Sequence, residues 1–302
     1  MHVIEFIIFK ILEGIFHLIP RRVCLFLGKI FGFLCFYLDN KRKKIALSNL
    51  SLAFPGKSHE FRKKIALESF MNFGMILFDL IKILTMKSDK LQSLFEIEGE
   101  ENIVKALSRD KGALLFTAHF GNWEVAPRII SNFGKLNVIA RPLDNPLLEK
   151  ELLKFRKKLG SEVIYKKEAS RKVLLALKNK EMVAILIDQN VLRSEGVFVD
   201  FFGKKASTTP SLAAFHLRTG APIVPVFCLP TSNNKYKIQI GIPLIFPRSK
   251  AHDKDILQIT QKCTKIIEHE IEKNPSFWLW FHRRWKTRPE EEKGGIEENE
   301  HE

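Results

Sequence analysis

Apolar segments of strand length that alternate with helical segments constrain the fold of this chain most strongly. From about residue 100, runs typical of buried strands occur at residues 113–118, 136–140, 163–165, 182–187, 223–229 and 236–240. Between them, apolar residues recur at helical spacing at about residues 123–131, 146–159, 169–179, 209–219 and 254–273. The alternation predicts an α/β fold with a mixed, largely parallel central sheet flanked by helices.

Two apolar runs precede this region, at residues 3–19 and 23–38. Each is shorter than the ~20 residues that a perpendicular transmembrane helix needs. The first run also contains Lys10 and Glu13, and the second contains Lys29. No basic residue precedes the first run and no small-residue cleavage site follows it, so a signal peptide is not expected.

Residues 1–40 are therefore expected to anchor the chain to a membrane, as an interfacial helix pair or as one tilted transmembrane helix. Arg21, Arg22 and the basic cluster at residues 41–44 follow the apolar runs, which favours a cytoplasmic location for the rest of the chain. The alternative is a pair of core helices in a soluble domain. The aromatic content of the runs favours anchoring, because it exceeds what a peripheral helix normally buries: Phe6, Phe9, Phe16, Phe26, Phe31, Phe33 and Phe36.

The remaining sequence divides into a large domain and a short tail. Residues 41–289 are predicted to form the α/β domain, with a helical lead-in to about residue 98 and a turn at residues 54–57. The tail at residues 290–302 is acidic and contains Gly294 and Gly295, so it is predicted to be disordered.

Charge and cysteine content limit the classes of partner. The formal net charge of +15 favours anionic partners: a lipid surface, phosphorylated substrates, an acidic carrier protein or nucleic acid. The alternative is that Lys and Arg only keep the surface solvated. Cys24, Cys35, Cys228 and Cys263 have no C-x-x-C spacing and no nearby His pair. They are expected to be free thiols in a reducing compartment, and no zinc site is expected.

The hexapeptide from His119 to Glu124 is the strongest chemical signal. It lies at a predicted strand-to-helix turn, where parallel sheets present their sites. An imidazole can deprotonate an attacking hydroxyl, and a carboxylate can fix its tautomer and stabilise the imidazolium. The pair therefore suits acyl transfer in which the substrate supplies the nucleophile. The alternative is a strand-end histidine with a structural hydrogen bond.

Polar residues also follow two further predicted strands. Arg141 comes after the strand at 136–140 and can bind a phosphate or a carboxylate with two hydrogen bonds. Asp188, Gln189 and Asn190 come after the strand at 182–187. Polar groups at three neighbouring strand ends predict a site, although Arg141 alone would be an ordinary surface arginine.

Two aromatic segments have more than one interpretation. The glycine-bounded segment at residues 196–203 either lines an apolar acyl slot or only packs in the core. The segment at residues 278–286 interleaves aromatic and basic residues, which suits single-stranded nucleic acid, a membrane interface or an anionic headgroup.

Together these segments resemble the lysophospholipid acyltransferase superfamily, and within it the late acyltransferases of lipid A biosynthesis. The resemblance covers residues 1–289 and is carried by residues 119–124, 141–146, 188–190, 196–203 and 278–286, with Pro275 before the last. It implies transfer of a fatty acyl chain from acyl carrier protein to a hydroxyl of a lipid A precursor. It also implies an anionic glycolipid acceptor and inner-membrane lipids as partners, no cofactor and no metal. The implied location is the bacterial inner membrane, with the catalytic domain on the cytoplasmic side.

The same resemblance implies roles for individual residues. His119 would be the general base, Glu124 its charge partner, and Arg141 the residue that positions or neutralises the acceptor. Backbone amides near Gly121 and Asn122 would stabilise the tetrahedral oxyanion. Substrate contacts are implied for the other motif residues: Phe120, Gly121, Asn122, Trp123, Pro142, Asp188 and Gln189.

Two departures from the wider superfamily matter. Glu124 stands where most members have aspartate, although the lipid A branch accepts either residue. The F-P-E-G-T-x motif is replaced by Asp188-Gln189-Asn190. Phospholipid-type donor and acceptor preferences are therefore not transferred to this chain.

Three alternatives stay open. A related enzyme that acylates another lipid, such as a phosphatidylinositol mannoside or a lysophospholipid-like acceptor, would share the same base motif. A basic nucleic-acid-binding protein would bind oligonucleotides in a salt-sensitive way, but nucleic acid is not the expected partner because this hypothesis gives the phenylalanine-rich N-terminus no role. A catalytically silent membrane scaffold is disfavoured by the presence of both His119 and Glu124.

Overall fold

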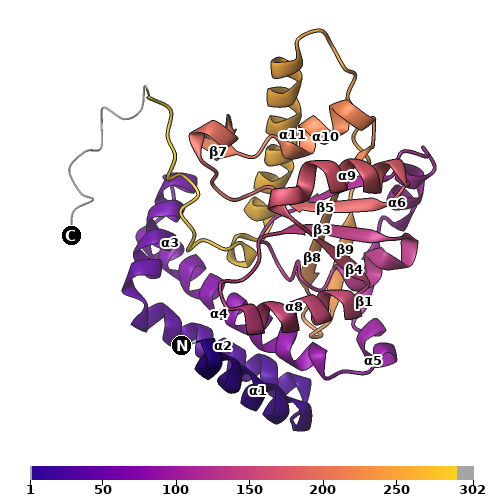
Figure 1. Cartoon of the computed structure of the whole chain (residues 1–302). Coiled ribbons are helices and arrows are strands. Elements are labelled where there is room, and N and C mark those ends of the chain that lie inside the picture. The colour runs from indigo at the N-terminus through magenta and orange to yellow at the C-terminus, as the bar shows by residue number, and fades with distance from the viewer. Residues whose placement is uncertain (1, 291–302) are drawn as a thin grey trace.

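The computed structural model describes residues 2–290 and has a central seven-stranded sheet with helices on both faces (Figure 1). The strand order is β1-β9-β8-β2-β5-β3-β4. β2, β3, β4, β5 and β8 run parallel, whereas β9 is antiparallel to β8 and parallel to β1. The predicted mixed, largely parallel α/β sheet is confirmed. Apart from Glu290, the tail that was predicted to be disordered lies outside the described residues.

All six predicted strands are present, and three others were not predicted. Phe95–Glu98 (β1) forms one edge of the sheet, and an antiparallel hairpin forms a separate two-stranded sheet. The strands are β2 Ala113–Thr117, β3 Leu136–Ala140, β4 Ser161–Tyr165, β5 Met182–Leu186, β6 Val197–Phe201, β7 Lys204–Thr208, β8 Ile223–Pro230 and β9 Tyr236–Ile240.

The helices also follow the sequence pattern, with one shorter than expected. In place of a helix at 123–131, a turn leads into Pro127–Ile130 (α7), because Pro127 has a preset φ and no N–H to contribute and so suits the first helical turn. The others are α1 His2–Leu18, α2 Arg21–Leu38, α3 Asn40–Ala53, α4 His59–Leu84, α5 Ser88–Gln92, α6 Glu100–Leu107, α8 Pro146–Lys158, α9 Ala169–Lys178, α10 Ser211–Thr219 and α11 His252–Lys273.

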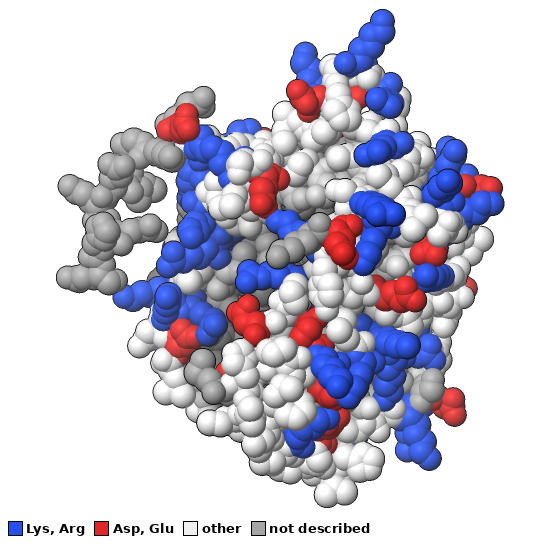
Figure 2. All heavy atoms as spheres, in the orientation of Figure 1, with Lys and Arg blue, Asp and Glu red and all other residues white. Residues whose placement is uncertain are grey.

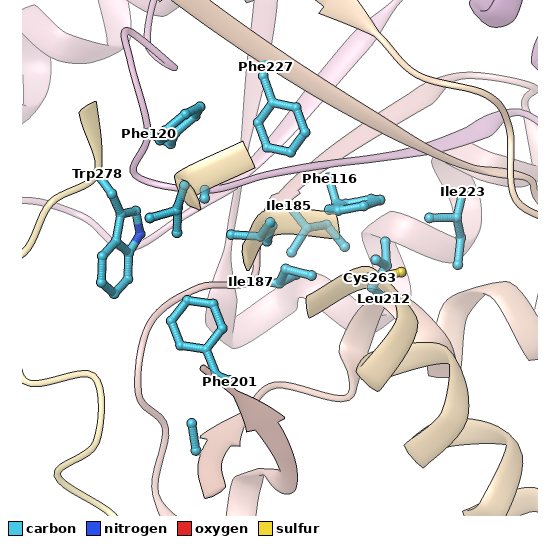
Figure 3. Close-up of a cluster of buried hydrophobic side chains, with 14 of the residues drawn as sticks. Phe116, Phe120, Ile185, Ile187, Phe201, Leu212, Ile223, Phe227, Cys263 and Trp278 are labelled. Carbon is cyan, nitrogen blue, oxygen red and sulfur yellow. The ribbon is translucent and has the colours of Figure 1, made fainter. Parts of the chain in front are cut away.

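The two faces of the sheet carry separate hydrophobic cores. On one face, Phe116, Ile185 and Ile223 pack with residues of α9, α10 and α11 (Figure 3). On the other, Leu115 and Met182 pack with residues of α6, α7 and α8. Burial on both faces explains why the central strands are apolar throughout rather than alternating.

The N-terminal apolar runs form two helices on the outside of the domain. The backbones of α2 and α4 approach so closely that a Cβ at Gly32 would lie 2.2 Å from the carbonyl oxygen of Phe70. Small residues allow such contacts between helices in membranes. Lys10 of α1 pairs with Glu13 and with Glu151 of α8, so the charges inside the first run are satisfied within the protein.

The outer faces of α1 and α2 are apolar and exposed. In Figure 2 this part of the molecule, at the bottom, carries few charged side chains, whereas Lys and Arg are frequent over the rest of the view. No single helix within residues 2–290 is long and apolar enough to cross a bilayer, and α2 passes that test only jointly with α3, across a 90° bend. The exposed residues are Val3, Ile4, Ile7, Ile8, Ile11, Ile15, Leu18, Val23, Phe26, Leu27, Ile30, Phe31, Phe33, Leu34, Tyr37 and Leu38.

Candidate active site

The strand order brings three predicted strand ends to one edge of the sheet. β2, β5 and β3 are neighbours and run parallel. Thr117 of β2 is paired with Leu186 of β5, so the residues two positions further along, His119 and Asp188, lie side by side. Arg141 follows β3 at the same edge. The three strand ends therefore meet where the sequence predicts a site.

His119 and Asp188 form a hydrogen-bonded pair. Nδ1 of His119 lies 2.8 Å from Oδ1 of Asp188, and the backbone N–H of His119 donates to Oδ2 at 2.9 Å. The indole N–H of Trp278 donates to the same Oδ2 at 2.8 Å. Because an ionised carboxylate only accepts hydrogen bonds, Nδ1 carries a proton and Nε2 keeps a lone pair, which faces the side-chain amide of Gln189 at 3.2 Å. The His119 side chain is 18% exposed, so the ring reaches the surface of the protein.

The Asp188 carboxyl group is held in its charged form. Burial by itself would raise its pKa, but the nearby imidazole and hydrogen bond of His119, together with His282 and the Trp278 N–H, bring the pKa well below its usual range. Asp188 can therefore fix the tautomer of His119 and stabilise an imidazolium.

Glu124, which was expected to pair with His119, contacts Arg156 instead. Within the described structure, the carboxylate on His119 is Asp188, whereas Glu124 accepts two hydrogen bonds from Arg156 of α8, at 2.6 and 3.1 Å. Glu124 lies in the turn before α7, and bidentate pairing with a guanidinium suits a carboxylate at this position. Arg156 was not singled out in the sequence, because an arginine on a basic helix carries no local signal.

The loop between His119 and Glu124 packs tightly against neighbouring backbone and is hydrogen-bonded to it. Gly121 has a φ of +61°, and a Cβ there would lie 2.1 Å from the Cys228 carbonyl oxygen. Its N–H donates to the carbonyl of Phe277, and the N–H of Asn122 donates to that of Cys228. Both backbone amides are therefore occupied, in contrast to the expected oxyanion role. Phe120 is fully buried and packs in the hydrophobic core.

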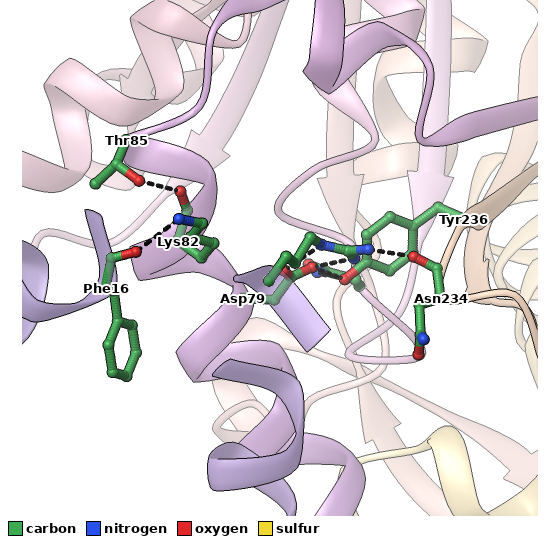
Figure 4. Close-up of polar contacts among 8 residues, drawn as sticks. Phe16, Asp79, Lys82, Thr85, Asn234 and Tyr236 are labelled. Atoms are coloured by element: carbon green, nitrogen blue, oxygen red, sulfur yellow. Dashed lines mark hydrogen bonds and ion pairs between the residues drawn. The ribbon is translucent and has the colours of Figure 1, made fainter. Parts of the chain in front are cut away.

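The side chain of Asn122 joins a buried polar network that reaches the N-terminal helices. Figure 4 shows Asp79, Tyr236 and Asn234 of this network. Its amide donates to the Tyr236 hydroxyl at 2.7 Å, and that hydroxyl donates to Asp79 of α4. Asp79 is held by two hydrogen bonds of 2.6 Å from Arg21, which also donates to the carbonyl of Asn234. Burial and the charge of Asp79 raise the pKa of Tyr236 well above its usual value, so the hydroxyl stays protonated.

The remaining predicted residues lie around the pair at different depths. Nε2 of Gln189 is 3.2 Å from Nε2 of His119, and the Gln189 side chain is exposed. Trp123 packs edge to face on the His119 ring, with 4.9 Å between the ring centroids. Arg141 and Pro142 are exposed, and Arg141 lies 3.4 Å from Asp144. Arg141 thus shares the sheet edge but does not contact the His119–Asp188 pair.

A cavity of about 70 Å³ is lined by Trp123, Glu124 and residues of β2, β3, β5 and β8. Nη1 of Arg156, which lines it, is buried and has no hydrogen-bond partner among the described residues. The rest of the wall is largely apolar and is formed by Leu115, Phe116, Thr117, Ala126, Pro127, Ile130, Leu136, Val138, Ile139, Ala140, Ser161, Ala184, Leu186 and Val226.

The two aromatic segments pack against each other. Residues 197–208 form the β6–β7 hairpin, whose Phe201 contacts Trp278 and Trp285 at 5.5 Å between ring centroids. Together with Trp280, these two indoles are at most 4% exposed. The core-packing interpretation of residues 196–203 therefore holds, and the buried tryptophans offer no stacking surface for nucleotide bases.

Within residues 2–290, no group of three or more His, Cys, Asp or Glu is arranged to hold a metal ion, and all four cysteines are free thiols.

Sequence comparisons identify the family of the chain. The family model for "Bacterial lipid A biosynthesis acyltransferase" matches residues 2–287. The chain is 29% identical over 273 residues to a lipid A biosynthesis palmitoleoyltransferase of Escherichia coli (strain K12), covering 90% of this chain and 87% of that protein. It is 28% identical over 276 residues to a lipid A biosynthesis lauroyltransferase of the same strain, covering 90% and 88%.

A more distant relative is a phosphatidylinositol mannoside acyltransferase of Mycobacterium tuberculosis (strain CDC 1551 / Oshkosh), which is 25% identical over 224 residues. That alignment covers 72% of this chain and 69% of the relative. The family match extends over nearly the whole chain and confirms the resemblance that the motifs predict. The protein is an acyltransferase and belongs to the bacterial lipid A biosynthesis acyltransferase family.

Proposed function

We propose that this acyltransferase moves a fatty acyl chain from the thioester of acyl carrier protein to a hydroxyl of a lipid A precursor. The observation that carries the proposal is the His119–Asp188 pair at the sheet edge. Trp123, which contacts the His119 ring, also lines a largely apolar cavity. In the proposed reaction, Nε2 takes the proton of the acceptor hydroxyl as its oxygen attacks the thioester carbonyl. The new ester C–O bond forms, the C–S bond breaks, and the carrier thiolate leaves.

Gln189 is the proposed donor to the tetrahedral oxyanion. Its side-chain amide lies within 3.2 Å of Nε2 of His119 and is exposed toward the site. The amides of Gly121 and Asn122 are occupied, so a side-chain donor is needed there. No cofactor or metal is required by this chemistry, because a thioester is already an activated acyl donor.

The exposed apolar faces of α1 and α2 support location at the bacterial inner membrane, with the catalytic domain on the cytoplasmic side. An amphipathic helix pair can bury such a face at the interface, next to Arg21 and Arg22 and the basic start of α3. This arrangement would bring the acceptor lipid to the site from the bilayer and the acyl carrier protein from the cytoplasm.

The acceptor is tested by incubating membranes that contain the protein with acyl-acyl carrier protein and a lipid A precursor, followed by mass spectrometry of the lipid. The expected result is a mass gain of one acyl chain. The relationship to a phosphatidylinositol mannoside acyltransferase makes that class of lipid the second candidate acceptor. A gain seen only with a phosphatidylinositol mannoside, and not with the lipid A precursor, would contradict the proposal.

The cavity lined by Trp123 and Glu124 is the proposed slot for the acyl chain, which makes Ala184 of β5 a determinant of chain length. Ala184→Met should fill part of the slot and exclude the end of a long acyl chain. Each methylene of the acyl chain that is excluded loses about 0.8 kcal/mol of burial, which lowers kcat/KM about fourfold. With two donors that differ by two carbons in competition, the product ratio should shift about fifteenfold toward the shorter chain. The rate with the shorter donor should stay near wild type, and an unchanged ratio would place the acyl chain elsewhere.

A further inference from the structure

A second concave surface, which we call the basic groove, lies between α3 and the C-terminal segment at residues 283–288. Its volume is about 380 Å³, within the size range of small-ligand sites. Lys44 and Ser48 of α3 form one wall, and Arg283 and Lys286 form part of the other. The remaining lining residues are Ile45, Asn49, Leu52, Trp285 and Arg288.

Three cations of the groove have no acidic partner within residues 2–290. No acidic residue contributes to its lining, and Lys44, Arg283 and Lys286 form no ion pair with any described residue. Trp285 is 4% exposed, and its indole N–H has no hydrogen-bond partner in the described part of the chain. Figure 2 shows Lys and Arg side chains gathered on the side of the molecule where α3 and the C-terminal segment lie. A groove with several cations and an unpaired donor is suited to an anion with several oxygens.

Hydrogen bonds connect the groove to Asn190, two residues after Asp188 of the catalytic pair. Asn49 of α3 donates to the carbonyls of Trp280 and His282, both at 2.7 Å, which fixes the two walls to each other. Thr287 exchanges two hydrogen bonds of 3.0 Å with Asn190, the residue after Gln189. A ligand in the groove would therefore contact the C-terminal segment that is bonded to Asn190, and the neighbouring residue Gln189 contacts His119.

The position of the groove along the chain indicates which anion it receives. α2 ends at Leu38 with an exposed apolar face, and α3 continues with the basic residues 41–44. A lipid whose acyl chains lie along α2 would place its headgroup beside α3, where phosphate is the anion to neutralise.

From these observations we propose that the basic groove binds a phosphate group of the acceptor glycolipid and so positions its hydroxyl at His119. The proposal rests on the proposed function, because it identifies the part of that acceptor which the groove recognises. Lys44, Arg283 and Lys286 supply the charge-assisted hydrogen bonds.

The test compares wild type with the double variant Arg283→Gln/Lys286→Gln in detergent micelles, using the same acceptor with and without its phosphate groups. For the phosphorylated acceptor, KM should rise about tenfold or more with little change in kcat, since two charged contacts are lost. For the dephosphorylated acceptor, the two proteins should have the same KM. The matched control is Lys254→Gln/Lys262→Gln on α11, which removes the same charge from exposed positions outside the groove and should behave as wild type.

Two further measurements separate the outcomes. Sedimentation with phosphatidylglycerol vesicles reports binding to bulk anionic lipid, and loss of this binding in the double variant with an unchanged KM would overturn the proposal. Calorimetric titration of the phosphorylated acceptor into each protein needs no turnover. Weaker binding only in the groove variant would support the groove even if no lipid A precursor were acylated, and equal binding in all proteins would contradict it.

Discussion

Replacing either member of the His119–Asp188 pair should lower kcat by about 10³- to 10⁴-fold while the protein stays folded. In Asp188→Asn, three N–H groups that now meet a carboxylate would face an amide with one acceptor oxygen and its own donors. His119 would then be held in the tautomer with the proton on Nε2, which cannot accept the proton of the acceptor hydroxyl. Initial rates of His119→Ala, Asp188→Asn and the double variant, measured by mass spectrometry of the lipid product, check this expectation.

The double variant should be no slower than the slower single variant, because residues that act as a unit are not additive. Glu124→Gln is the matched control, since it also neutralises a carboxylate near the site but one that contacts Arg156. Its kcat should fall far less than that of Asp188→Asn, because it leaves the His119–Asp188 contact intact. If Glu124→Gln lowered kcat as much as Asp188→Asn, Glu124 would be the partner of His119 during catalysis.

The central sheet could be predicted from the sequence because its strands are buried on both faces. The run at residues 182–187 is apolar throughout and is bounded by polar residues, so its type and length are encoded locally. β1 is different. Its sequence alternates Phe95 and Ile97 with two glutamates, and it exists only because β9 pairs with it from far along the chain. A short edge strand of this kind has no distinct local pattern.

The partner of His119 could not be predicted for a related reason. Glu124 is five residues away in sequence, whereas Asp188 is separated by 69 residues and becomes adjacent only through the β2–β5 register. Sequence spacing does not say which way a side chain points in a turn. The side chain of Glu124 points toward Arg156 and pairs with it. This contact depends on where α8 packs.

The network below the site joins the N-terminal helices to the catalytic loop through one buried carboxylate. The Asp79 side chain has no exposed surface, and the Arg21 side chain is 12% exposed. Charges removed from water in this way require their partner, because an uncompensated buried ion is costly. Tyr236 extends the contact from Asp79 to Asn122, three residues from His119.

Asp79→Asn should therefore destabilise the protein by about 3–5 kcal/mol, because it leaves Arg21 without a buried counter-charge. For a protein of this size the corresponding fall in Tm is on the order of 10 °C, measurable by thermal unfolding of the purified protein in detergent. Tyr236→Phe is the control: it keeps the Arg21–Asp79 pair and should cost only about 1–2 kcal/mol for the lost hydroxyl. Activity should fall in both variants at a temperature where each is folded. Tyr236→Phe removes the hydroxyl that Asn122 contacts, and Asp79→Asn alters the group that holds this hydroxyl in place. An Asp79→Asn protein that melts like wild type would show that the pair contributes nothing to the fold, and that the N-terminal helices and the catalytic loop are coupled by packing alone.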